Sequence, residues 1–371
     1  AARSLPSRRR LFYPAIAAAG AGVLGGAVYL FKPKPVPVAA PVTAPPPPAG
    51  PLRSVRILAG NLAGGFIGPN GEEWTGDRYF EGGRAVRDPS PLVLNCDETR
   101  LYQYHREGDF IYAIPLEPGV YEVRLYFLEF HYGQNSQAGG GETSRLFRRS
   151  INGAPVCDPL DVIAESGGRG MALRKVFIDA EPDKDGKLRL RFESLRPDKA
   201  FVNAVEVVPG VRGHMLPLRL AASPQGVRDS EGHLWEADSF VTGGRRASRS
   251  EPVQGAASPQ LFLSERFGIF TYPLQAVKGR RYTLNIWISE QYFGLPVAPP
   301  GRFRSFDLFI NGVAVARGVN PLKLAGEPRR ALRLSYSGLE PDAYGAIRVH
   351  FMPAVNYAAV NALELIDESA G

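Results

Sequence analysis

The residues best suited to chemistry are aromatic rings close to carboxylates or amides, which occur in two clusters. The first cluster holds Trp74, Tyr79, Tyr132 and Asp198, and the second holds Trp235, Phe240, Tyr292, Phe293 and Asn356. Rings of this kind lie beneath the apolar face of a sugar, while carboxylates and amides hydrogen-bond its hydroxyl rim. Core packing competes as an explanation for any single ring. Trp74 and Trp235 fall in glycine-rich turns, where a core explains them less well.

Catalytic and metal-binding patterns are weak by comparison. A glycosidase needs two carboxylates facing one bond, and the chain offers Asp77, Glu129 and Asp198, then Asp238 and Glu290. There is no Gly-x-Ser-x-Gly elbow. The five histidines lack ligand spacing, and Asp183-Lys184-Asp185-Gly186 reads better as a hairpin turn than as the start of a calcium loop. We therefore expect no enzyme, no metal and no cofactor.

Both clusters belong to a tandem repeat with a period of about 160 residues. A Gly-x-x-Trp-x-x-Asp motif followed by Gly-Gly-Arg occurs at 71–84 and again at 232–245. Further matched pairs are 106–112 with 266–272, Glu129 with Glu290, 151–153 with 310–312, and 202–204 with 360–362. The repeat predicts two domains, 53–209 and 216–368.

Each copy shows the pattern of a β-protein. Apolar residues alternate with polar ones over 121–127 and 282–288, which is typical of half-buried strands. Asn-Gly and Asp-Gly dipeptides mark turns between such runs. We predict an all-β chain of two antiparallel sandwiches. Glu129 and Glu290 each end a strand, and we expect them to be structural, paired with Arg106 and Arg266.

The first 52 residues differ in composition from the rest. A basic segment, 1–10, precedes an uncharged apolar run, 11–31, which as a helix would be about 31 Å long and could cross a bilayer. A proline-rich linker, 32–52, follows. We expect a retained transmembrane anchor with the body outside the cytoplasm, periplasmic or extracellular. A signal peptide cleaved after Ala40 and a twin-arginine signal are the alternatives.

The glycine pair of the apolar run and the two cysteines each allow two interpretations, whereas the charge balance argues against one class of partner. Gly22 and Gly26 would let two membrane helices approach closely, so a homodimer through this face is one interpretation and ordinary helix composition is the other. Cys96 and Cys157 are compatible with one disulfide or two buried thiols. Beyond residue 50 the acidic and basic residues nearly balance, so we expect no nucleic acid partner.

The repeated motifs resemble the malectin family of di-glucose-binding β-sandwich modules. The resemblance covers 55–368, carried by the Trp-x-x-Asp turn, the stretch with Phe110 and Tyr112, and the Ile-Asn-Gly and Val-Asn-Ala segments. It implies two jelly-roll domains. The family's Tyr-Phe pair falls on His131-Tyr132 and Tyr292-Phe293, its late Asp on Asp198 and Asn356, and its early Tyr near Trp74 and Trp235. A further family Tyr has no counterpart.

The expected function is therefore non-catalytic binding of a saccharide, which the resemblance implies to be a glucose-containing oligosaccharide. The predicted binding residues are Trp74, Tyr79, His131, Tyr132, Asp198, Trp235, Phe240, Tyr292, Phe293 and Asn356. The alternative is a structural or protein-interaction ectodomain of a membrane receptor or sensor that has lost sugar binding.

Overall fold

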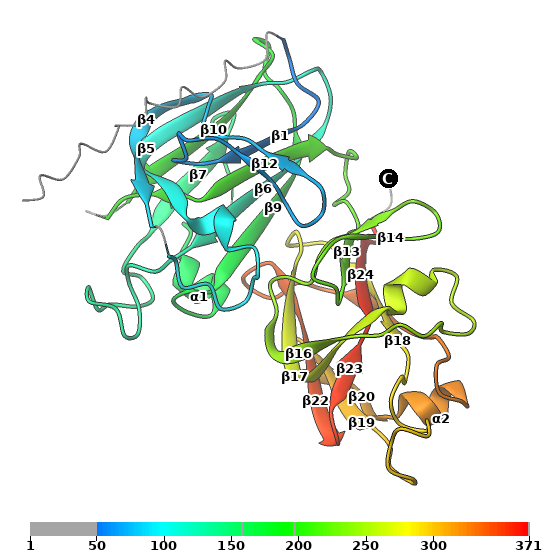
Figure 1. Cartoon of the computed structure of the whole chain (residues 1–371). Coiled ribbons are helices and arrows are strands. Elements are labelled where there is room, and N and C mark those ends of the chain that lie inside the picture. Colours follow the sequence, from blue (N-terminus) through cyan, green and yellow to red (C-terminus); the bar gives the residue numbers. More distant parts are fainter. Residues whose placement is uncertain (1–49, 89, 157–158, 196–197, 370–371) are drawn as a thin grey trace, which may run out of the picture. The chain divides into compact units, whose positions relative to one another are not determined.

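A computed structural model describes residues 50–88, 90–156, 159–195 and 198–369 (Figure 1). Strands dominate the described residues, and their two α-helices, α1 (Val162–Ser166) and α2 (Pro321–Ala325), have five residues each. The predicted all-β tandem fold is confirmed. The predicted anchor, 11–31, lies outside the described residues, and no helix within them is long and apolar enough to cross a membrane.

The first domain is built from two antiparallel sheets. The first sheet has the order β1-β12-β6-β9, with bounds Val55–Leu58, Ala204–Pro209, Tyr121–Leu128 and Ala172–Ala180. The second sheet has the order β11-β5-β10-β7-β8, with β4 also paired to β5. Its strands are β11 (Phe201–Val202), β5 (Tyr104–Pro115), β10 (Lys187–Ser194), β7 (Phe147–Ile151), β8 (Ala154–Pro155) and β4 (Phe80–Arg87).

The second domain repeats this arrangement. One sheet has the order β13-β24-β18-β21, with bounds Leu218–Ala221, Ala362–Asp367, Tyr282–Ile288 and Leu332–Leu339. The other has the order β16-β17-β22-β19-β20, with β23 (Ala358–Val360) also paired to β17. Its bounds are Thr242–Ser248, Ser264–Gln275, Ala346–Val355, Ser305–Ile310 and Val313–Val319.

Short elements complete both domains. In each, a two-stranded ribbon carries the predicted tryptophan turn: β2 (Phe66–Ile67) with β3 (Glu73–Trp74), and β14 (Val227–Arg228) with β15 (Leu234–Trp235). A 3-10 helix precedes the long strand of each domain, η1 (Thr99–Tyr102) before β5 and η2 (Pro259–Phe262) before β17.

Strand alternation builds the core between the two sheets. On β6, Val123, Leu125 and Phe127 point into the first core, where they meet Tyr112 of β5 and Leu190 of β10. Every one of these side chains is at most 2% exposed. Burying each large apolar side chain stabilises the fold by roughly 1.5–3 kcal/mol. Tyr282, Leu284, Ile286 and Ile288 of β18 play the same part in the second core.

A buried Asp–Arg–Tyr triad joins three segments in each domain. Asp77, which follows the tryptophan turn, accepts hydrogen bonds from Arg106 Nε at 2.9 Å, Tyr112 Oη at 2.8 Å and the Gly60 amide at 2.6 Å. Asp238 accepts from Arg266 Nε at 2.8 Å and Tyr272 Oη at 2.7 Å. Burial raises the pKa of both aspartates, and the neighbouring arginine and tyrosine oppose that rise.

The same arginines explain the Gly-Gly-Arg triplets. Arg106 Nη1 donates to the carbonyl of Gly82 at 2.8 Å, and Arg266 Nη1 donates to that of Gly243 at 2.7 Å. The edge strand bulges at this point. Gly83 has a φ of 64°, and a Cβ there would lie 2.9 Å from the Glu107 carbonyl oxygen. Only glycine therefore lets the edge strand pass this close to β5.

Replacing Asp77 with Asn should destabilise the first domain strongly. The change leaves the Arg106 guanidinium, whose side chain is 3% exposed, without its counter-charge. Breaking a buried ion pair on one side costs about 3–5 kcal/mol, and the free energy of unfolding from chemical denaturation measures the loss. The control is Asp185→Asn at an exposed turn, which should change that energy by less than about 0.5 kcal/mol. Equal effects of the two changes would refute the role of the triad.

Candidate functional site

Each domain holds a pocket next to a carboxylate that caps the turn after its central strand. Glu129 Oε1 accepts the amide hydrogens of His131 at 2.8 Å and Tyr132 at 3.3 Å. Glu290 Oε1 accepts those of Tyr292 and Phe293, both at 3.1 Å. The glutamates are therefore the groups that fix the predicted aromatic pairs in place.

The cationic partners of these glutamates differ from the prediction. Glu129 pairs with Arg145 at 2.9 Å, and Glu290 pairs with Arg304 at 2.8 Å. The predicted partners, Arg106 and Arg266, instead bind the triad aspartates. The prediction failed because both kinds of carboxylate are buried, and sequence alone does not show which buried acid lies within reach of which arginine. The true partners stand two residues before the matched Phe147 and Phe306, at the same place in both copies.

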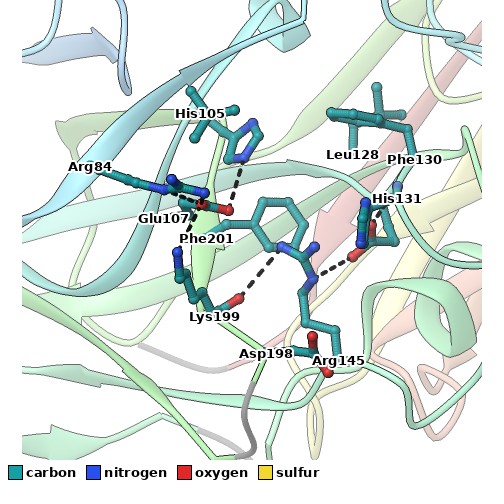
Figure 2. Close-up of a pocket in the computed structure, with 12 residues that line it drawn as sticks. Arg84, His105, Glu107, Leu128, Phe130, His131, Arg145, Asp198, Lys199 and Phe201 are labelled. Atoms are coloured by element: carbon teal, nitrogen blue, oxygen red, sulfur yellow. Dashed lines mark hydrogen bonds and ion pairs between the residues drawn. The ribbon is translucent and has the colours of Figure 1, made fainter. Parts of the chain in front are cut away.

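The first-domain pocket has a volume of about 300 Å³ and is dominated by ions (Figure 2). Glu107 lies among the Arg84 guanidinium, Lys199 Nζ at 3.3 Å and His105 Nε2 at 3.6 Å. The His105 and Arg84 side chains hold the pKa of Glu107 far below its ordinary range. The carboxylate is therefore ionised at neutral pH and already paired with two cations, Arg84 and Lys199.

Three predicted residues come together at the rim of this pocket. His131 and Asp198 line it, and Tyr132 Oη donates a hydrogen bond to Asp198 Oδ1. The rings of His131 and Tyr132 meet edge to face, with centroids 4.6 Å apart. The Arg145 guanidinium lies 5.5 Å from the Tyr132 ring centroid. The hydroxyl hydrogen of Tyr132 is therefore already donated to Asp198 and is not free for a ligand.

The second-domain pocket has a volume of about 520 Å³ and a different chemistry. The predicted Tyr292, Phe293 and Asn356 all line it. Tyr292 is 39% exposed, whereas Phe293 is 7% exposed and forms part of the wall. Asn356 Nδ2 donates to the Phe303 carbonyl at 2.6 Å, which leaves its amide oxygen for other contacts.

Two aromatic residues of this pocket were missed by the sequence analysis. Phe267 stands where the first copy has Glu107, between the matched Arg266 and Gly268. Tyr357 follows Asn356, is 59% exposed, and its ring centroid lies 5.7 Å from that of Phe267. The sequence did indicate Phe267, because this ring stands where the matched motif of the first copy has a charged residue, Glu107. Tyr357 had a weaker signal, because Lys199 stands at its place in the first copy.

Trp74 and Trp235 are not in either pocket. They are 2% and 3% exposed, so core packing explains both rings although they lie in glycine-rich turns, contrary to the expectation. Each ribbon folds back over the first sheet of its domain, on the face opposite the main core. Trp74 packs edge to face on Tyr126 with centroids 5.6 Å apart, and Trp235 packs on Trp287 at 5.0 Å. A second, smaller core on that face explains both rings.

Tyr79 and Phe240 also lie away from the pockets. Tyr79 packs against the main core of the first domain. Phe240 packs against Tyr126 of the first domain, at a centroid distance of 6.4 Å. Of the ten predicted binding residues, the structure therefore places His131, Tyr132 and Asp198 at one pocket and Tyr292, Phe293 and Asn356 at the other.

Cys96 is a buried thiol, and burial raises its pKa to about 12. Its candidate disulfide partner, Cys157, lies outside the described residues. No group of three His, Cys, Asp or Glu side chains that could hold a metal ion occurs in the described ranges.

The family model of the malectin domain matches residues 56–209 and 218–339. The chain belongs to the malectin domain family. Two plant kinesin-like proteins each match about a third of the chain: KIN-14E of Oryza sativa subsp. japonica, 29% identical over 128 residues, and KIN-14R of Arabidopsis thaliana, 28% identical over 124 residues. The matches cover only 11% and 10% of those proteins.

Solved structures similar to the two malectin domains include plant receptor ectodomains. The plant receptor-like kinase FER is 15% identical over 86% of this chain and 96% of that chain, with a TM-score of 0.45. The ANX2 ectodomain from Arabidopsis thaliana is 17% identical over 85% and 97%, with a TM-score of 0.45. The structure of the plant peptide RALF23 in complex with FER and LLG2 matches with 15% identity over 86% of this chain and 96% of that chain, with a TM-score of 0.42.

Glu129→Gln in the first malectin domain and Glu290→Gln in the second should reduce stability more than ligand affinity. Each change removes the nearest counter-charge of a mostly buried arginine, at a cost of about 3 kcal/mol. Chemical denaturation gives the stability, and titration per folded molecule gives the affinity. Glu142→Gln, at an exposed residue, is the control and should change neither. A variant that unfolds like the unaltered chain but no longer binds would make these glutamates ligand contacts instead.

Proposed function

We propose that this chain is a non-catalytic binding protein whose second malectin domain holds a saccharide. The observation that carries the proposal is the exposure of two tyrosine rings, Tyr292 and Tyr357, beside Phe267 in one pocket. A sugar stacks its apolar face on such rings. The amide of Asn356 and the guanidinium of Arg302 lie in the same lining and can bond the hydroxyl rim.

The two pockets differ in what they can accept. Glu107 lines the first pocket with Arg84, Lys199 and His105 around it, and Phe267 puts a ring at the matching place in the second. At this position a neutral sugar would meet ion pairs in the first pocket and an aromatic ring in the second. The second domain is therefore the better site for a neutral oligosaccharide, including the glucose-containing ligand expected of the family.

The carboxylates argue against hydrolysis. Glu129 is buried and engaged with two amides and Arg145. The lowered pKa of Glu107 keeps it ionised, so it is a poor general acid. In the second pocket, Asn356 stands in place of Asp198, and the remaining carboxylate of the lining, Glu265, is buried and paired with Arg249. Asp198 in turn accepts a hydrogen bond from Tyr132. The carboxylates of both linings are thus held by arginine, amide or hydroxyl donors, unlike the free acid and base or nucleophile that glycosidases use.

A second candidate function is binding of a protein or peptide, and the first pocket favours it. The side chains of Arg84 and Lys199 are 67% and 46% exposed at this pocket. Exposed cations of this kind can pair with an acidic segment of a partner. Either function fits a body held outside the cytoplasm by a membrane anchor at 11–31, which we keep as part of the proposal.

Replacing both Tyr292 and Tyr357 with Ala should abolish saccharide binding. Each stacked ring contributes on the order of 1 kcal/mol beyond its buried area, so the double change should weaken binding by at least about thirtyfold. The measurement is retention of the full chain on a glycan array, followed by titration with the sugars retained. Tyr344→Ala, at an exposed ring outside this pocket, should bind normally.

Two results would count against the saccharide. The first is unchanged glycan binding by the double variant while circular dichroism stays native. The second is a chain that retains no glycan but binds an acidic peptide, with that binding lost on Arg84→Glu. The second result would establish the protein-interaction candidate instead.

A further inference from the structure

A cavity of about 450 Å³ lies on the first sheet of the second domain, on the face opposite its main core. Its lining includes Arg219, Trp235, Phe262, Trp287, Arg333 and Glu364. None of these residues lines the saccharide pocket proposed above. We call this surface the outer face of the second domain.

The first domain has an equivalent outer face, built from matching residues in matching register. On it, Tyr126 of β6 stands opposite Arg174 of β9. In the second domain, Trp287 of β18 stands opposite Arg333 of β21. The other matched groups are the buried tryptophans Trp74 and Trp235, and the ion pairs Arg56–Glu206 at 2.7 Å and Arg219–Glu364 at 2.8 Å.

A turn of the second domain covers the outer face of the first. Glu236 places one oxygen 2.7 Å from Arg174 Nη1 and the other 3.4 Å from Arg124 Nη1. Four residues later, the Phe240 ring packs on Tyr126, and the Arg174 guanidinium lies 5.2 Å from that ring's centroid. The face thus accepts a carboxylate and an aromatic ring from one turn, and Arg174 is 4% exposed as a result.

On the outer face of the second domain, Arg333 and Trp287 stand where the first domain has Arg174 and Tyr126. Arg333 is exposed, and no hydrogen bond or ion pair joins its side chain to another residue that the structure describes. Trp287 beside it is half-buried. We propose that this face binds a protein turn that presents a carboxylate to Arg333 and an aromatic side chain to Trp287, as Glu236 and Phe240 do on the first domain.

The polar groups of the cavity favour a protein turn over a second sugar. The Trp235 ring is buried and its Nε1 donates to Asp229 at 3.0 Å, so it offers no open platform. Arg219 and Glu364 satisfy each other, and Asn285, at the place of Arg124, donates to Glu364 at 3.1 Å. Because Arg219 is paired with Glu364, Arg333 is the arginine of the lining whose guanidinium is available to a ligand. A guanidinium favours a negatively charged ligand.

The test uses the full chain and a cyclised synthetic peptide of residues 234–242, with benzoylphenylalanine at the place of Phe240 as a photo-crosslinker. Labelling should map to β18 and β21 around Trp287. Arg333→Glu in the chain should reduce labelling and affinity at least about tenfold, as expected for one charge-assisted hydrogen bond. The same peptide with Gln for Glu236 should show an equal loss. Arg317→Glu, at an exposed arginine on the other sheet, should bind the peptide normally.

Three outcomes would overturn the proposal. One is equal labelling of Arg333→Glu and the unaltered chain, with native circular dichroism in both. Another is labelling absent from β18 and β21, whether the peptide attaches elsewhere or not at all. The third is a saccharide from the array whose binding is lost in Arg333→Glu but kept when Tyr292 and Tyr357 are both Ala.

Discussion

The buried contact between an aspartate, an arginine and a tyrosine is the constraint on which each domain depends. In the first domain, Arg106 of β5 binds both Asp77, after the tryptophan turn, and the carbonyl of Gly82 on the bulged edge strand. In the second domain, Arg266 of β17 binds Asp238 and the carbonyl of Gly243 in the same way. Burying these charges costs several kcal/mol, and only nearly complete hydrogen bonding offsets that cost. The Gly-Gly-Arg and Trp-x-x-Asp motifs recur together because they are the two ends of this contact.

The triad also leaves the neighbouring pocket free to change. Glu107 and Phe267 directly follow the triad arginines, and alternation along the strand turns them to the other side, into the pocket. A charge can therefore become a ring there without disturbing the frame. In the first domain this position holds Glu107 within an ion cluster, and in the second it holds Phe267 within an aromatic wall. The capping glutamates and their arginines stayed the same in both.

Alternation and repetition in the sequence were enough to predict the strands, the two sandwiches and the segment that carries each pocket. Tyr292 and Phe293 were found because they follow the capping glutamate of a repeated motif, and Asn356 because it matches Asp198 of the first copy. Trp74 and Trp235 were misplaced because a glycine-rich turn does not show which sheet face it will fold against. Phe240 was misplaced because its contact lies on another domain. Arg145 and Arg304 act on carboxylates some fifteen residues away, a pairing that no local pattern reveals.

The central claim is that the two malectin domains share a frame but differ in ligand, with the saccharide in the second. The most direct measurement is a titration of the chain with a glycan retained on the array, followed by backbone amide chemical shifts. The account predicts shifts around Phe267, Tyr292 and Asn356, with the amides around Glu107 and Asp198 unchanged. Shifts confined to the first-domain pocket, or equal shifts in both, would contradict it.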